Sequence, residues 1–140
     1  MLIGAIDPGK NGGWALFDSD TGKLVSAGRL LFDNPRHLYM TFFECCEIVI
    51  EEVHGSSNQG QSQAFEFGRA HGRAEAAAMM TGADIYYVSP QWWKPKLAVS
   101  TDKAKATEKA LKLIPGLNRF VKYKADDGVA EAALIGLCLI

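Results

Sequence analysis

Acidic residues stand beside apolar segments in three separate parts of this chain. Asp7 ends one apolar run and Glu51 ends another, while Asp127 and Glu131 open an apolar stretch near the C-terminus. Carboxylates that crowd together repel one another unless a hard cation such as Mg²⁺ neutralises them. If folding brings these acids to one edge of a sheet, they form a metal site suited to phosphodiester chemistry.

The C-terminal acids are spaced so that one face of a helix can carry both. Asp127 and Glu131 are four residues apart, and a helix N-terminus offsets part of their mutual repulsion. Asp126 is open to two interpretations, since Asp serves well as an N-cap but can also bind metal. Glu51 and Glu52 point to opposite faces of a strand, and we favour Glu51 for the site. A capped acidic helix start, an acidic edge strand and an Asp-Pro-Gly turn are the purely structural alternatives.

Length and composition indicate one globular domain spanning residues 1–140, with 48% hydrophobic residues to fill a core. The chain has no run of eighteen apolar residues, so we expect no transmembrane helix. The N-terminus does not read as a secretion signal. We therefore expect a cytoplasmic protein, or one in a host's cytoplasm if it is viral. The three cysteines fit neither a zinc spacing nor a disulfide framework.

Positive charge is concentrated in one segment, although the net charge is only −1. Residues 94–124 contain Asp102 and Glu108 as their only acids. A basic segment next to an acidic cluster suits a protein that binds a phosphate backbone and places metal ions on it. A solvated lysine-rich helix face is the alternative. The basic residues of the segment are Lys94, Lys96, Lys103, Lys105, Lys109, Lys112, Arg119, Lys122 and Lys124.

Hydrophobic periodicity and turn residues predict a mixed α/β sheet with helices on its faces. The expected strands are residues 2–7, 14–17, 24–30, 47–53 and 85–88, and the expected helices are residues 35–43, 62–81, 101–114 and 127–140. Two loops then lie near the acids. The Gly-rich hairpin after Asp7 carries Lys10, and the polar loop after Glu51 carries His54, Asn58 and Gln59. All four are candidates for binding nucleic acid.

Small residues recur every four positions in the expected helix over 62–81. Gly68, Gly72 and Ala76 form a flat stripe that allows close approach of another backbone, either the sheet or a second subunit. Trp92 and Trp93 are open to a core or a DNA-facing position, and we expect at least one of them in the core.

Five motifs, in this order along the chain, resemble those of the RuvC-like Holliday junction resolvases, with the phage and viral branch looking most similar. They are Ile6-Asp7-Pro8-Gly9, Ile50-Glu51-Glu52-Val53, Phe67-Gly68-Arg69-Ala70-His71-Gly72, Val88-Ser89-Pro90 with Trp93-Lys94, and Asp127-Gly128-Val129-Ala130-Glu131-Ala132. The resemblance implies an RNase H-like fold with a five-stranded mixed sheet. It also implies a homodimer formed by the helix with the glycine stripe, dependence on Mg²⁺ or Mn²⁺, and paired cuts at four-way DNA junctions.

On this resemblance, Asp7 and Glu51 are the first two metal ligands, and Asp127 and Glu131 are the last two. The mechanism it implies is two-metal hydrolysis, with ions ~3.5–4 Å apart. Basic positions that the family uses on the scissile phosphate match Lys94, and Lys103 or Lys105. The chain departs from bacterial members in the four-residue spacing and in having Glu131 as its last acid. It also has His54 where those members often carry an aromatic wedge.

Other functions remain open from the sequence. An ATP-binding domain of the sugar-kinase and chaperone class shares the topology but needs two such domains to enclose a nucleotide. A nuclease that trims ribosomal RNA precursors shares both the fold and the acids. A junction-binding module without chemistry would use the basic segment alone. Nothing in the sequence decides a preference for the dinucleotide at the cut.

Overall fold

The computed structural model describes residues 1–31, 34–52 and 58–140. Its centre is a five-stranded sheet in the order β3-β2-β1-β4-β5. The strands are β1 (Leu2–Asp7), β2 (Gly13–Asp18), β3 (Lys23–Arg29), β4 (Cys45–Glu51) and β5 (Asp84–Val88). The first three form an antiparallel meander, and β4 and β5 run parallel to β1. The expected mixed sheet is therefore confirmed.

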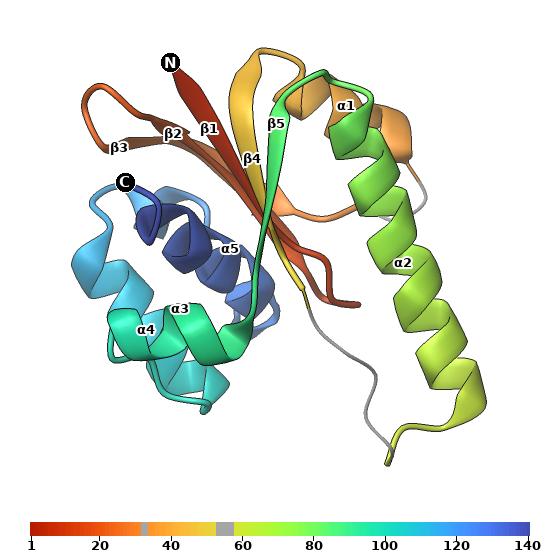
Figure 1. Ribbon diagram of the computed structural model, residues 1–140. Helices are drawn as coiled ribbons and strands as arrows, with labels where there is room; N and C mark the ends of the chain where they lie inside the picture. Colours follow the sequence, from red (N-terminus) through yellow and green to blue (C-terminus); the bar gives the residue numbers. More distant parts are fainter. Residues whose placement is uncertain (32–33, 53–57) are drawn as a thin grey trace.

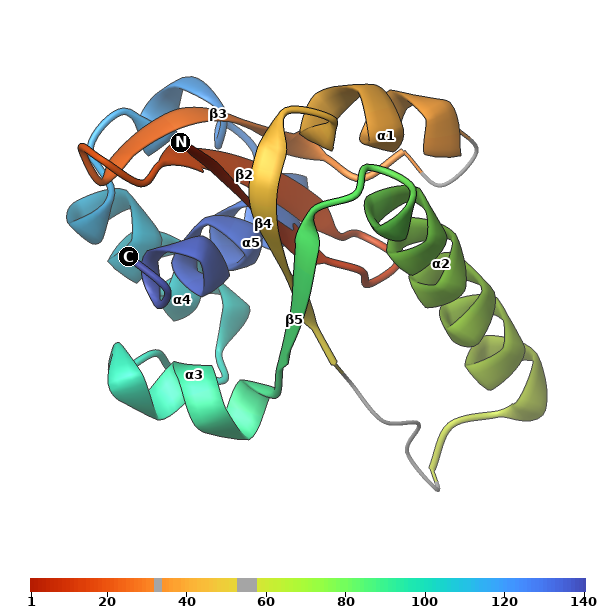
Figure 2. The same ribbon diagram turned by 45° about the horizontal axis from the view of Figure 1, so that its top comes forward.

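Helices cover both faces of this sheet (Figures 1 and 2). On one face lie α1 (Pro35–Phe42) and α2 (Gln61–Met79), and on the other lie α3 (Pro90–Lys96), α4 (Lys103–Leu113) and α5 (Asp127–Leu137). Short 3₁₀ turns, η1 (Leu117–Arg119) and η2 (Lys124–Asp126), connect α4 to α5. The five expected strands and four expected helices match β1–β5, α1, α2, α4 and α5 to within a few residues. After Ser89-Pro90 the sequence is compatible with a short turn or a helix, and the structure has α3 there; the two 3₁₀ turns were not expected. No helix among the described residues is long and apolar enough to span a bilayer.

The central strands are apolar on both faces because each face packs on its own helical layer. Ala5 and Val49 belong to the core beneath α5, whereas Ile6 and Ile50 belong to the core beneath α1 and α2. Side chains alternate along a strand. Asp7 and Glu51, two positions after Ala5 and Val49, therefore face the α5 layer.

Helix α5 lies directly on the β1–β2 hairpin because glycines on both sides remove the intervening side chains. Gly12 forms an isolated parallel bridge with Gly128 at the start of the helix. A Cβ atom on Gly13 would lie 2.5 Å from the backbone N and Cα of Val129. Further along α5, a Cβ on Gly136 would lie 2.6 Å from the ring of Phe17. This close contact fixes the first turn of α5 against the strand ends.

Helix α2 packs on the body of the protein through its C-terminal half. Ala74, Ala77 and Ala78 are buried, whereas the helix extends away from the sheet toward its N-terminus (Figures 1 and 2). A Cβ at Gly68 or Gly72 would meet nothing within 4 Å. The glycine stripe therefore does not pack on the sheet, which removes one of the two partners that the sequence left open.

We expect Gly13→Ala to lower the free energy of unfolding by about 3 kcal/mol, or ~10 °C in Tm, because the methyl group collides with backbone that cannot move aside. Gly60→Ala is the matched control, since its Cβ meets nothing within 4 Å and its φ is −64°. Thermal unfolding followed by circular dichroism measures both. Equal stability of the two variants would contradict the close contact described above.

Candidate active site

Four carboxylates from three elements line one pocket at the end of the sheet. Asp7 ends β1, Glu51 ends β4, and Asp127 and Glu131 stand on the first turns of α5. The cavity between them has a volume of about 260 Å³. The i, i+4 spacing of the α5 pair and the parallel register of β1 and β4 explain why residues so far apart in the chain meet here.

The surroundings of Asp7 oppose the ionisation of its carboxyl group. Burial, together with the negative charges of Glu51 and Glu131, raises the pKa of Asp7 to about 7, against weaker opposing effects of the Gly9 amide and Lys103. That amide donates to Asp7 Oδ1 at 3.1 Å. The raised pKa means that the ionised form of Asp7 is unfavourable in this pocket. A cation that binds beside Asp7 would displace its proton and stabilise the ionised carboxylate.

The carboxylate of Glu51 is held by a hydrogen bond from a buried tryptophan. Glu51 is 5% exposed, and the indole N–H of buried Trp93 donates to its Oε2 at 2.5 Å. Burial raises the pKa of Glu51, and the negative charge of Glu131 raises it as well. The hydrogen bond from Trp93 and the charge of Lys94 lower it. Trp93 therefore orients the carboxylate toward the pocket. The expectation that one tryptophan belongs to the core is met, since Trp92 is half-exposed and stacks under Lys96.

Two lysines hold the α5 carboxylates. Lys103 Nζ lies 3.1 Å from Asp127 Oδ2, and Lys94 Nζ lies 3.8 Å from Glu131 Oε2. The contact with Asp127 raises the pKa of Lys103. Lys105, the alternative to Lys103, is exposed on the first turn of α4 and does not line the pocket.

Asp126 has a different position from its neighbour. Its Oδ1 accepts from Arg29 Nε at 2.6 Å, and its Oδ2 accepts from the amides of Lys122 and Tyr123, both at 2.9 Å. Burial alone would raise the pKa of Asp126, but these three donors lower it. The carboxylate makes no capping bond to α5 and does not line the pocket. Asp127 is therefore the candidate ligand at this position, and Asp126 holds the turn before it.

The donor set fits a hard divalent cation, because Mg²⁺ and Mn²⁺ prefer carboxylate oxygens. Within the described residues, no three acidic, histidine or cysteine side chains are close enough to form a ready-made cage. Lys103 and Lys94 contact Asp127 and Glu131 instead, so a bound cation would take the place of these two lysines as the partner of the α5 carboxylates.

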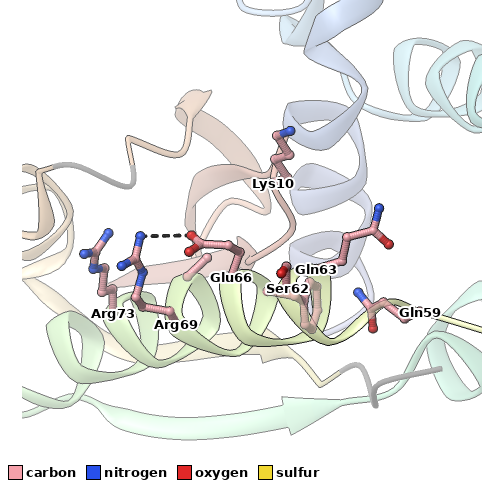
Figure 3. Close-up of a pocket in the computed structure, with 9 residues that line it drawn as sticks. Lys10, Gln59, Ser62, Gln63, Glu66, Arg69 and Arg73 are labelled. Atoms are coloured by element: carbon pink, nitrogen blue, oxygen red, sulfur yellow. Dashed lines mark hydrogen bonds and ion pairs between the residues drawn. The ribbon is translucent and has the colours of Figure 1, made fainter. Parts of the chain in front are cut away.

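A second, larger groove adjoins the pocket and shares Lys10 and Phe67 with it. Its volume is about 610 Å³, and Figure 3 shows Lys10 from the β1–β2 loop above a row of α2 side chains. Arg69 forms an ion pair with Glu66 at 2.9 Å, and Arg73 lies one turn further on. Gln59 lines this groove as well, and Asn58 is exposed just before it. His54 lies outside the described residues.

Sequence reasoning missed several residues of this region. In the sequence, Arg69 appears only within the Phe67–Gly72 motif, and Arg73 belongs to none of the five motifs. Sequence reasoning also missed the Trp93–Glu51 and Arg29–Asp126 contacts, because each joins residues at least 42 positions apart. An i, i+4 pair of arginines on a helix already expected near the site was the one available signal for the groove.

The raised pKa of Asp7 sets an expected pH dependence of stability without metal. The folded protein keeps a proton that the unfolded chain releases between pH ~4 and 7, so stability falls as pH rises through this window. Asp7→Asn should therefore be more stable than wild type at pH 8, by up to about 4 kcal/mol, with the difference shrinking toward pH 4.

Thermal unfolding from pH 4 to 8 in EDTA measures this difference, with Asp84→Asn at the exposed start of β5 as control. Adding Mg²⁺ or Mn²⁺ at pH 8 should raise the Tm of wild type more than that of Asp7→Asn. A wild type whose stability rises between pH 4 and 7, in parallel with Asp7→Asn, would contradict the assignment.

Comparisons with known proteins give a structural likeness only. No protein-family model and no curated protein sequence matches this chain. Among solved structures, RuvC of Thermus thermophilus in complex with a Holliday junction substrate aligns with a TM-score of 0.66 and 19% identity, over 99% of this chain and 92% of that one. A second Thermus thermophilus RuvC structure aligns with a TM-score of 0.63 and 20% identity, over the same shares. At this identity the comparison establishes the fold, and the expected RuvC-like, RNase H-like architecture is confirmed.

Proposed function

We propose that this chain is a divalent-metal-dependent endonuclease that cuts branched DNA, with the four-way junction as its principal substrate. The observation that carries the proposal is the convergence of Asp7, Glu51, Asp127 and Glu131 on one pocket. Lys94 and Lys103 contact two of these acids, and a groove with Lys10, Arg69 and Arg73 adjoins the pocket. The structural neighbour that was solved with a Holliday junction supports the choice of DNA over other phosphodiesters.

The four carboxylates would hold Mg²⁺ or Mn²⁺, which supplies an activated water and neutralises charge on the leaving oxygen. Trp93 fixes the orientation of Glu51, and the Gly9 amide fixes that of Asp7. Lys94 and Lys103, once released from Glu131 and Asp127, can reach a phosphate bound over the pocket. Lys10, Arg69 and Arg73 provide further positive charge along the adjoining groove.

A junction has two strands to cut, and two sites are needed to cut them together. The α2 face of Phe65, Gly68, Gly72, Ala76 and Met79 is exposed, and apolar side chains flank its glycines. An exposed apolar helix face of this kind is typical of a protein interface. We propose that it joins two copies of this chain, with β5 as the neighbouring unpaired edge of the sheet.

Cleavage of a synthetic four-way junction tests the central proposal. With Mg²⁺ or Mn²⁺, wild type should make paired, symmetric nicks, and EDTA should abolish them. Asp7→Asn and Glu51→Gln should each reduce the rate at least ~100-fold, because each removes a metal ligand, while binding of the junction persists. Asp84→Asn should cut like wild type.

Two other outcomes would replace this proposal. Binding without cleavage in any metal would favour a junction-binding module. Metal-dependent cleavage of structured RNA in preference to the DNA junction would favour an RNA nuclease of the same fold.

The dimer face is tested by Gly72→Leu, which introduces bulk on the exposed side of α2 without a clash inside one chain. Wild type should elute as a dimer in size-exclusion chromatography with light scattering, and the variant as a monomer with an unchanged or higher Tm. Gly60→Leu, an equally open glycine just before the helix, should remain dimeric. A monomeric wild type, or a Gly72→Leu dimer, would refute this interface.

A further inference from the structure

A third cleft opens from the catalytic pocket on the side opposite the α2 groove. It lies between α4 and the segment that leads into η2, has a volume of about 350 Å³, and shares Lys103 and Asp127 with the catalytic pocket. Leu111 and Val121 form apolar parts of its wall. A strand whose phosphate lies at the four carboxylates would place its next nucleotide in or beside this cleft.

The rim of the cleft carries an exposed aromatic ring between two cations. Tyr123 is 70% exposed, and Lys122 and Lys124 flank it, both also exposed. Neither lysine ammonium forms an ion pair within the part of the chain that the structure describes. Single exposed rings are common on protein surfaces. Tyr123 differs because it lies at the rim of a cleft, with an exposed lysine on each side of it in the chain.

The backbone that presents this ring is held firmly. Asp126 is 4% exposed, and its carboxylate accepts the amides of both Lys122 and Tyr123. Arg29 at the end of β3 holds the other oxygen of the same carboxylate. The turn is thus fastened to the far side of the sheet meander, and Tyr123 is presented from a fixed position. Because the backbone of this turn is already held, binding there avoids the entropic cost of ordering a loop.

An aromatic ring beside lysines is the chemistry that recognises an unpaired nucleotide. The ring stacks on the π-face of a base, and the ammonium groups bind the adjacent phosphates. A base inside a continuous duplex has both faces covered by its neighbours, so only an unpaired or terminal base can offer a free face. The apolar wall and basic rim of the cleft match the sugar-and-base and phosphate parts of such a nucleotide.

We propose that this cleft receives an unpaired nucleotide next to the scissile phosphate, with its base stacked on Tyr123 and its phosphates bound by Lys122 and Lys124. The proposal deepens the proposed function and rests on it for the position of the cut. It identifies a source of selectivity for branched over continuous DNA, because unpairing a base costs less where a branch point interrupts stacking than inside a continuous duplex.

The test uses four-way junctions in which 2-aminopurine replaces one base at successive positions around the cut. Binding is measured in EDTA, so that no strand is cleaved. At saturating protein, emission from one position beside the cut should differ between wild type and Tyr123→Ala, and Tyr123→Phe should behave as wild type because it keeps the ring. Tyr123→Ala should bind the junction about tenfold more weakly than wild type does. Lys23→Ala, at the opposite end of the sheet, should change neither readout.

Each outcome decides the proposal. Wild-type cleavage with Tyr123→Ala unchanged in affinity and in emission at every position would overturn the stacking site and leave the nuclease intact. Emission that depends on Tyr123 without cleavage in any metal would support the site and overturn the proposed chemistry. Absence of binding to branched DNA would overturn both. Because Tyr123 is exposed, the Ala variant should keep the wild-type Tm, which confirms that it is folded.

Discussion

The contact of backbone on backbone between the β1–β2 hairpin and the start of α5 is the constraint on which the site depends. Gly12 and Gly13 on one side and Gly128 on the other leave no side chain between the two elements. The first turn of α5 is thereby held beside the end of β1, and Asp127 and Glu131 come to the same pocket as Asp7. A single methyl group at this contact would push the two halves of the carboxylate set apart.

The crowding of four carboxylates in this site lowers the stability of the folded protein. Four acids share one pocket, and burial together with two neighbouring charges raises the pKa of Asp7 to about 7. The protein offsets part of this with Trp93 behind Glu51, and with Lys94 and Lys103 across from the α5 acids. These lysines stand where a substrate phosphate would also need them. We infer that bound metal and DNA take over the neutralisation that the lysines provide in the free protein.

The sequence predicted most of the fold because its strongest signals are local. Apolar runs that end in Asp7 and Glu51, and the four-residue spacing of Asp127 and Glu131, indicated strands and a helix whose ends meet. The contacts that the sequence did not indicate join residues that are far apart in the chain. Nothing near Trp93 indicates a hydrogen bond to Glu51, and nothing near Arg29 indicates that it holds Asp126, which is 97 residues away. The exposure of Tyr123 was likewise hidden, since an aromatic residue between lysines fits a buried or an exposed position equally well.

Metal binding at the four carboxylates is the central claim, and diffraction from crystals grown with Mn²⁺ tests it most directly. The anomalous signal of manganese should appear between Asp7, Glu51, Asp127 and Glu131, with Lys94 and Lys103 moved away from Glu131 and Asp127. Crystals of Asp7→Asn should lose or weaken this signal. Manganese that binds elsewhere, or carboxylates that still pair with both lysines at millimolar Mn²⁺, would contradict the account.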